Sequence, residues 1–165
     1  MFAIVFIHMA VMSICGSRGG RNMETSALNI AKYTINKCAE EGNPISNLHL
    51  QKILYFIQRE FLKNGIVAFS DRIEAWQFGP VVPDVYAHYC GFGAMRINRN
   101  YNIILDSFDK QKFDMINSVI AEKSIIYPWD LVEETHEKGK AWDIIFKDGD
   151  GNKAVIPTEL IKELG

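Results

Sequence analysis

The stretch EAWQFGPVVPDVY, residues 74–86, decides how the middle of the chain folds. Its first residues alternate between two faces, with the glutamate and both aromatic side chains on one of them, which predicts a short strand. Gly79 and Pro80 predict a break in that strand, because glycine adopts backbone angles that other residues avoid and proline has no N–H for a β-ladder. Pro83 suits the first position of a helix, and the carboxylate of Asp84 suits its positive end. The stretch therefore predicts a strand, a rigid corner and a helix start.

The composition is that of a globular protein. The chain has 165 residues, of which 48% are hydrophobic and 12% aromatic, which suits one domain with a real core. Its formal net charge of −2 disfavours a nucleic-acid partner and leaves only a local basic patch for that role. Cys15, Cys38 and Cys90 have no CxxC spacing, and their odd number favours reduced thiols in the cytoplasm.

The N-terminal segment has a different character from the rest of the chain. Residues 1–15 (MFAIVFIHMAVMSIC) are almost wholly apolar but shorter than the ~20 residues that span a bilayer, and no basic residue precedes them as in a secretory signal. A glycine- and arginine-containing run follows. We expect translation to begin at Met23, so that residues 1–22 are an upstream mis-start outside the fold and residues 23–165 form a single domain. A membrane-anchoring extension is the alternative.

Apolar spacing predicts a mainly helical, α+β domain. Helices are expected at 26–39, 47–63, 83–90, 109–123, 128–137, 140–147 and 157–164. Short strands are expected at 73–78, at 66–69 and within 96–105, the last of these pairing with 73–78. The expected architecture is a compact helical domain with a small two- or three-stranded β element around the corner between Trp76 and Pro83.

The first two expected helices, joined by a short turn, resemble a helix-turn-helix. The second one carries Tyr55, Phe56 and Phe61 and few polar side chains that could contact base edges, so we predict that it packs inside the domain. A basic and aromatic cluster around Arg96 and Tyr101 could hold a phosphate, but a solvated loop is favoured. A DNA-binding regulator of an operon remains the alternative function.

Two motifs together resemble the Panacea antitoxin domain, also called the SocA-like or phage-associated domain. They are LQKILYF at residues 50–56 and AWQFGPVVPDVY at 75–86, and the resemblance continues through Thr135-His136 to Trp142. The family commonly has proline before this tryptophan, where the chain has Ala141. The resemblance implies a bacterial antitoxin that neutralises a cognate toxin by direct contact, in some members as an adaptor, with a protease or chaperone as a second partner.

The resemblance also implies a partner-binding region around the corner. Its candidate residues are Gln51, Lys52, Tyr55, Trp76, Phe78, Pro80, Val82, Pro83, Tyr86, His136 and Trp142. Aromatic anchors on a stiff element are typical of binding hot spots. For Trp76 and Phe78, a place in the hydrophobic core is an equal alternative.

No catalytic constellation accompanies His136, the histidine most suited to acid–base chemistry. The chain has no nucleophile elbow, phosphate loop or HExxH helix, and its four histidines are far apart in the sequence. We therefore predict no catalytic residues, no cofactor and no enzyme, and expect His136 to end a helix and pack on Trp142. An enzyme using His136 is the second alternative.

One segment follows part of a calcium-loop pattern. Asp148, Asp150, Asn152 and Glu159 stand where an EF-hand places oxygen ligands, but Lys153 occupies the position that needs glycine. A surface turn is the favoured interpretation.

Overall fold

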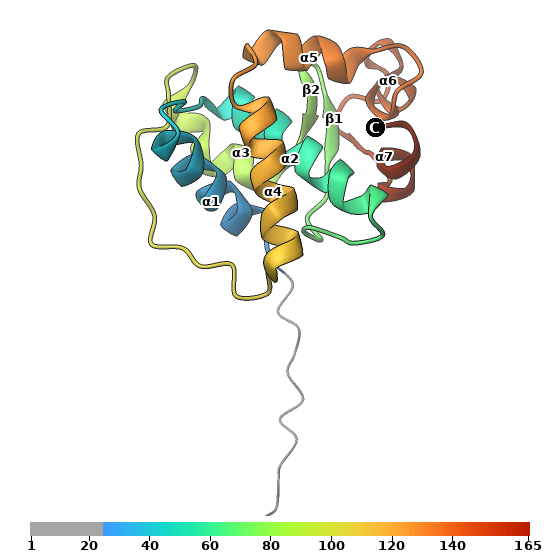
Figure 1. Ribbon diagram of the computed structural model, residues 1–165. Helices are drawn as coiled ribbons and strands as arrows, with labels where there is room; N and C mark the ends of the chain where they lie inside the picture. The colour runs from blue at the N-terminus through green and yellow to red at the C-terminus, as the bar shows by residue number, and fades with distance from the viewer. Residues whose placement is uncertain (1–24) are drawn as a thin grey trace, which may run out of the picture.

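The computed structural model describes residues 25–165, so the predicted extension 1–22 and the expected start at Met23 lie outside the described residues. Within this part, helices surround a small antiparallel sheet (Figure 1). The α-helices are α1 (Ala27–Glu40), α2 (Asn47–Lys63), α3 (Pro83–Tyr89), α4 (Lys110–Lys123), α5 (Pro128–His136), α6 (Ala141–Phe146) and α7 (Thr158–Leu164). The strands are β1 (Glu74–Trp76), β2 (Gly79–Val81) and β3 (Ala154–Val155), and two 3₁₀ turns are η1 (Cys90–Phe92) and η2 (Lys147–Gly149). The predicted mainly helical α+β class is confirmed.

Local sequence signals explain where the helices begin. Ser26, Ser46 and Asp109 precede α1, α2 and α4, and each side chain accepts a hydrogen bond from a backbone N–H of the first turn. Pro83 and Pro128 occupy the first turns of α3 and α5, where the missing proline N–H has no helical partner to lose. None of the helices in residues 25–165 combines the length and apolar character needed to cross a bilayer.

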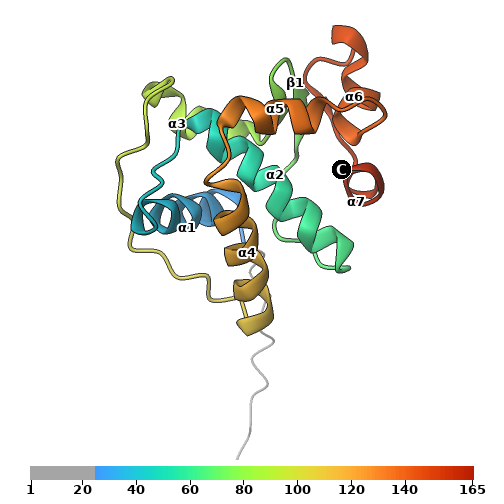
Figure 2. The same ribbon diagram turned by 45° about the horizontal axis from the view of Figure 1, so that its top comes forward.

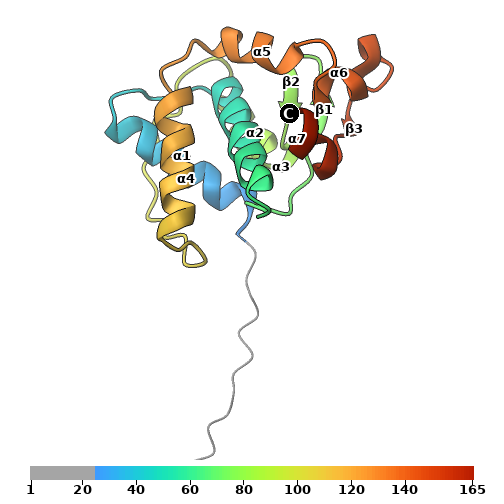
Figure 3. The ribbon, with the colours of Figure 1, turned by 45° about the vertical axis from the view of Figure 1, so that its right-hand side comes forward.

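Helix α2 is the centre of the fold. It lies between α1 and α4 on one side and the sheet and α7 on the other, with α5 across its N-terminal half (Figures 2 and 3). Its buried residues include the apolar stripe and also Gln51, Lys52 and Gln58, so it is enclosed on nearly all sides. This confirms the predicted packing role. A helix so enclosed has no free face to enter a DNA groove.

The sheet has the order β2-β1-β3, and Gln77 with Phe78 forms the turn between β1 and β2. The prediction that Gly79 and Pro80 break the strand is wrong, since both belong to β2. Proline is tolerated there because β2 is an edge strand. The carbonyl of Pro80 accepts a hydrogen bond from Lys52, so the polar side of this residue faces away from β1.

Gly79 is required by both conformation and space. Its φ of +98° lies in a region that side chains other than glycine rarely adopt. A Cβ at this position would stand 2.6 Å from Lys52 Nζ and 2.8 Å from Thr135 Oγ1. The close approach of the β2 backbone to α2 and α5 therefore depends on the absence of a side chain.

The other two predicted strands are wrong. Residues 66–69 form no ladder, because the side-chain amide of Gln58 bonds the backbone of Ala68 and Phe69 in place of a neighbouring strand. Between 96 and 105 the only pairing in the described chain is an isolated bridge from Arg96 to Ser46. The third strand is β3, which pairs Val155 with Glu74.

Candidate partner-binding cleft

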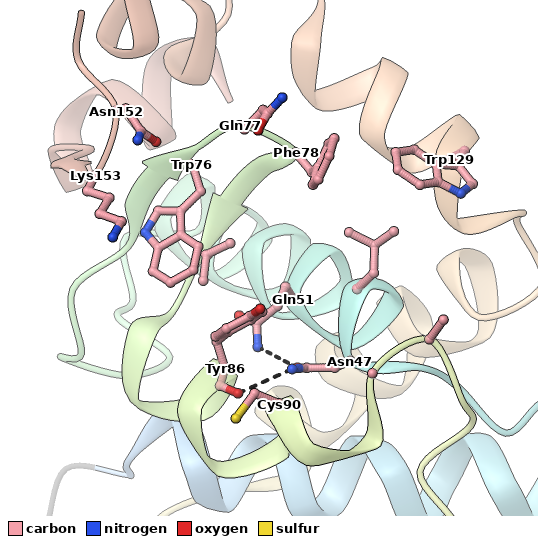
Figure 4. Close-up of a pocket in the computed structure, with 14 residues that line it drawn as sticks. Asn47, Gln51, Trp76, Gln77, Phe78, Tyr86, Cys90, Trp129, Asn152 and Lys153 are labelled. Carbon is pink, nitrogen blue, oxygen red and sulfur yellow. Dashed lines mark hydrogen bonds between the residues drawn. The ribbon is translucent and has the colours of Figure 1, made fainter. Parts of the chain in front are cut away.

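A cleft of about 490 Å³ opens beside the β1–β2 turn. The start of α2, the turn, α3, the loop after η1, the start of α5 and the segment before β3 all contribute to its walls (Figure 4). Trp76, Phe78, Tyr86 and Trp129 supply its aromatic surface, and Lys153 lies at one side. Segments far apart in the sequence thus meet around the predicted corner.

The aromatic side chains are paired across the cleft. The rings of Trp76 and Tyr86 have centroids 4.9 Å apart, and those of Phe78 and Trp129 lie 5.4 Å apart in an edge-to-face arrangement. Phe78 and Trp129 are 49% and 44% exposed, so neither belongs to the core. Large aromatic side chains that stay exposed on a rigid support are the groups that bury most area when a partner binds.

Polar contacts fix the orientation of the Trp76 ring. Its Nε1 donates to Glu74 Oε2 at 2.9 Å, and Arg72 Nε donates to Glu74 Oε1 at 2.7 Å. Lys153 Nζ stands 5.4 Å from the Trp76 ring centroid, within cation–π range. The indole is therefore held in place before any partner arrives.

Gln51 and Lys52 hold the corner from behind. Gln51 Oε1 accepts from the backbone N–H of Val82 at 2.9 Å, and its Nε2 donates to Asn47 Oδ1 at 3.1 Å. Lys52 Nζ donates to the carbonyl of Pro80 at 2.9 Å. Gln51 is 2% exposed at the floor of the cleft and Lys52 is 0% exposed. The structure thus places both predicted contact residues as supports of β2 and of Val82 after it: Lys52 is closed to a partner, and Gln51 reaches the cleft only at its floor.

The predicted site residues fall into two groups. Trp76, Phe78, Tyr86 and Gln51 line the cleft. The others pack behind or beside it: Lys52, Tyr55, Pro80, Val82, Pro83, His136 and Trp142. Sequence reasoning missed Trp129 and Lys153. The only available signal for Trp129 was a tryptophan directly after a helix-starting proline, and Lys153 gave none beyond its glycine-rich surroundings.

His136 and Trp142 brace the inner side of the sheet. Their rings stack with centroids 3.6 Å apart and an interplanar angle of 3°, as expected for a helix-end histidine packed on this tryptophan. Trp142 Nε1 donates to the carbonyl of Trp76 at 2.8 Å. His136 Nε2 is buried, and no group in residues 25–165 hydrogen-bonds it. A general base would need an oriented, accessible nitrogen, so this geometry disfavours the enzyme hypothesis.

Burial, with a smaller contribution from Lys52, lowers the pKa of His136 to about 4. The unfolded chain takes up this proton near pH 6.5 and the folded chain only near pH 4, so the fold loses stability as pH falls through that window. We expect the melting temperature to fall by a few degrees less between pH 7 and pH 5 in His136→Gln than in the wild type. The exposed-residue control His88→Gln should keep the wild-type slope, and equal slopes for His136→Gln and wild type would contradict the buried, neutral imidazole.

The four residues that follow part of the calcium-loop pattern do not form a metal site of acidic side chains. In the described part of the chain, no group of three His, Cys, Asp or Glu side chains could hold a metal ion. The backbone N–H of Lys153 instead donates to the carbonyl of Ala75 at 2.7 Å and leads into β3, while Glu159 lies on α7. The segment is a turn that joins α6 to the sheet.

The fold and the cleft define a class: a mainly helical domain with an aromatic cleft, in which the Nε2 atom of His136 is enclosed. The chain belongs to the SocA-like antitoxin family, since the family model described as "Antitoxin SocA-like, Panacea domain" matches residues 50–143. It is similar to Antitoxin SocA of Caulobacter vibrioides (strain NA1000 / CB15N), with 33% identity over 127 residues covering 70% of this chain and 68% of that protein. The predicted family is confirmed. No solved structure gives a significant match.

Proposed function

We propose that the protein is the antitoxin of a toxin–antitoxin pair and neutralises its cognate toxin by direct contact through the aromatic cleft. Membership of the antitoxin family supports the class. The observation that carries the assignment to this surface is the half-exposed pair of Phe78 and Trp129 beside the braced Trp76. The protein acts without catalysis, in a reducing cytoplasm where Cys38 and Cys90 remain thiols.

Neutralisation and delivery to a protease are separable forms of this function. Both need the same cleft to hold the toxin, but only delivery shortens the toxin's lifetime. If the purified protein inhibits the purified toxin with no protease present, neutralisation occurs by binding alone. A toxin half-life in cells that falls when the antitoxin is present would add the adaptor role.

The test is co-expression with the open reading frame next to the gene. We expect this neighbour to arrest growth when expressed alone and to be harmless when the chain is present, because a bound toxin cannot reach its target. Restored colony counts, together with co-purification of the two proteins, are the measurement. A toxic neighbour that the chain neither binds nor rescues would overturn the proposal.

A further inference from the structure

A second cleft, of about 420 Å³, lies next to the first. Arg96 and Ser124 line it, together with the side chains of Ile125 and Tyr127, which are 72% and 62% exposed. The Ser124 hydroxyl is buried there and has no hydrogen-bond partner in residues 25–165. This cleft therefore combines open apolar surface with one unsatisfied hydroxyl group, which is unusual for a surface that stays in water.

The two clefts adjoin. Ala94 lines both of them. At the start of α2, Ser46 lines the second cleft and Asn47 the first, and at the start of α5 the same is true of Pro128 and Trp129. Apolar surface thus continues from Phe78 past the α5 N-terminus toward Ile125.

The charged residues that line the two clefts have one sign, and the nearby Glu74 carboxylate, which interacts with Lys153, is paired with Arg72. The lining residues include Lys153 in the first cleft and Arg96 in the second, and neither an aspartate nor a glutamate. His49 also lines the second cleft, but burial lowers its pKa and its ring bonds the carbonyl of Lys123. Neither Arg96 nor Lys153 forms a salt bridge within residues 25–165, although the whole chain carries a net charge of −2. A cationic groove on a mildly acidic chain selects an anionic partner.

We propose that the two clefts form one groove for an extended segment of the toxin. Its apolar or aromatic side chains pack on the exposed aromatic and aliphatic residues of the groove, and its acidic side chains lie against Lys153 in the first cleft and Arg96 in the second. This inference rests on the proposed function for the identity of the partner. The apolar and acidic character of the segment is inferred from the residues that line the groove.

Peptides test the groove independently of any toxin. The probes are fluorescein-labelled peptides with a central Trp-Leu-Phe sequence flanked by aspartate, serine or lysine, titrated with the full chain and followed by anisotropy. We expect the aspartate-flanked peptide to bind roughly tenfold tighter than the lysine-flanked one at low salt, with the ratio shrinking at high salt. Arg96→Glu/Lys153→Glu should reverse the order. The matched control Arg99→Glu/Lys162→Glu, which changes two exposed cations outside the groove, should not.

The outcomes separate the inference from the proposed function. Equal affinity for all three peptides, no detectable binding of any, or reversal by the control variant would overturn the groove. If the wild-type chain rescues its toxic neighbour and Arg96→Glu/Lys153→Glu rescues it as well with unchanged affinity, the groove is again overturned while the antitoxin role stands. If the wild-type chain does not rescue cells that express the toxic neighbour, the proposed antitoxin function is wrong. The peptide titration then still tests whether the groove prefers acidic segments.

Discussion

Replacing Phe78 and Trp129 together with alanine should abolish toxin neutralisation while leaving the fold intact. The two rings form an edge-to-face pair and are about half exposed, so their burial against a partner removes large apolar area from water. Truncating hot-spot aromatics costs at least about 2 kcal/mol each. We therefore expect the double variant to bind the toxin more than ~100-fold more weakly in a titration of the purified proteins.

The single variants show whether the pair acts as a unit. The two rings are in contact, so removing one changes how much of the other is exposed. The losses of toxin-binding free energy in the two single variants should therefore not sum to the loss in the double variant. Val67→Ala is the matched control, since Val67 is exposed and lies outside both clefts. Melting temperatures of all variants should stay close to that of the wild type. Full neutralisation by the double variant would remove the cleft from the proposed function.

Helix positions could be predicted from this sequence because their signals are local. Capping residues and helix-starting prolines act within one turn, so Ser46, Asp109 and Pro128 mark real boundaries. Strand pairing depends on distant partners, and there the prediction failed. The Gln58 amide replaces a ladder at residues 66–69, and β3 comes from a two-residue segment far along the chain.

The candidate site was predictable in its outline only. The alternation of side chains placed Trp76 and Phe78 on one face of the predicted strand. Helix α2 is enclosed on nearly all sides, so its apolar periodicity does not show which of its polar residues can contact a partner. Gln51 and Lys52 therefore belonged to the predicted contact set, although Lys52 bonds the backbone of β2 and Gln51 bonds that of Val82 directly after it. The two motifs that carry the family resemblance meet through these hydrogen bonds. The motif at residues 75–86 forms part of the cleft wall, and the motif at residues 50–56 supports that wall from behind.

Replacing Lys52 with methionine should make the protein more stable, not less. The ammonium group is fully buried, and its one hydrogen bond in the described chain goes to the Pro80 carbonyl. Burial lowers the pKa of Lys52 from 10.5 to about 7, and that difference corresponds to about 5 kcal/mol. Methionine fills similar space without this penalty and leaves a buried carbonyl unpaired, which costs roughly 1–3 kcal/mol. A net gain of at least about 2 kcal/mol should raise Tm at pH 7 by roughly 5 °C or more.

The pH dependence identifies the cause of this gain. The unfolded chain keeps the Lys52 proton up to pH 10.5 and the folded chain only to about 7, so wild-type stability rises with pH across that window. Between pH 7 and about 8.5 the free energy of unfolding of the wild type should rise by roughly 1.5 kcal/mol, as measured by urea unfolding. In Lys52→Met this rise with pH should be absent. Measurements stop below pH 9 because burial raises the pKa of Cys38 to about 12, so that above pH 9 the Cys38 thiol makes stability fall with pH and offsets the rise due to Lys52. The exposed control Lys162→Met should follow the wild type. A lower Tm for Lys52→Met at pH 7 would show instead that the hydrogen bond to Pro80 stabilises the β2 corner by more than the burial of the amine costs.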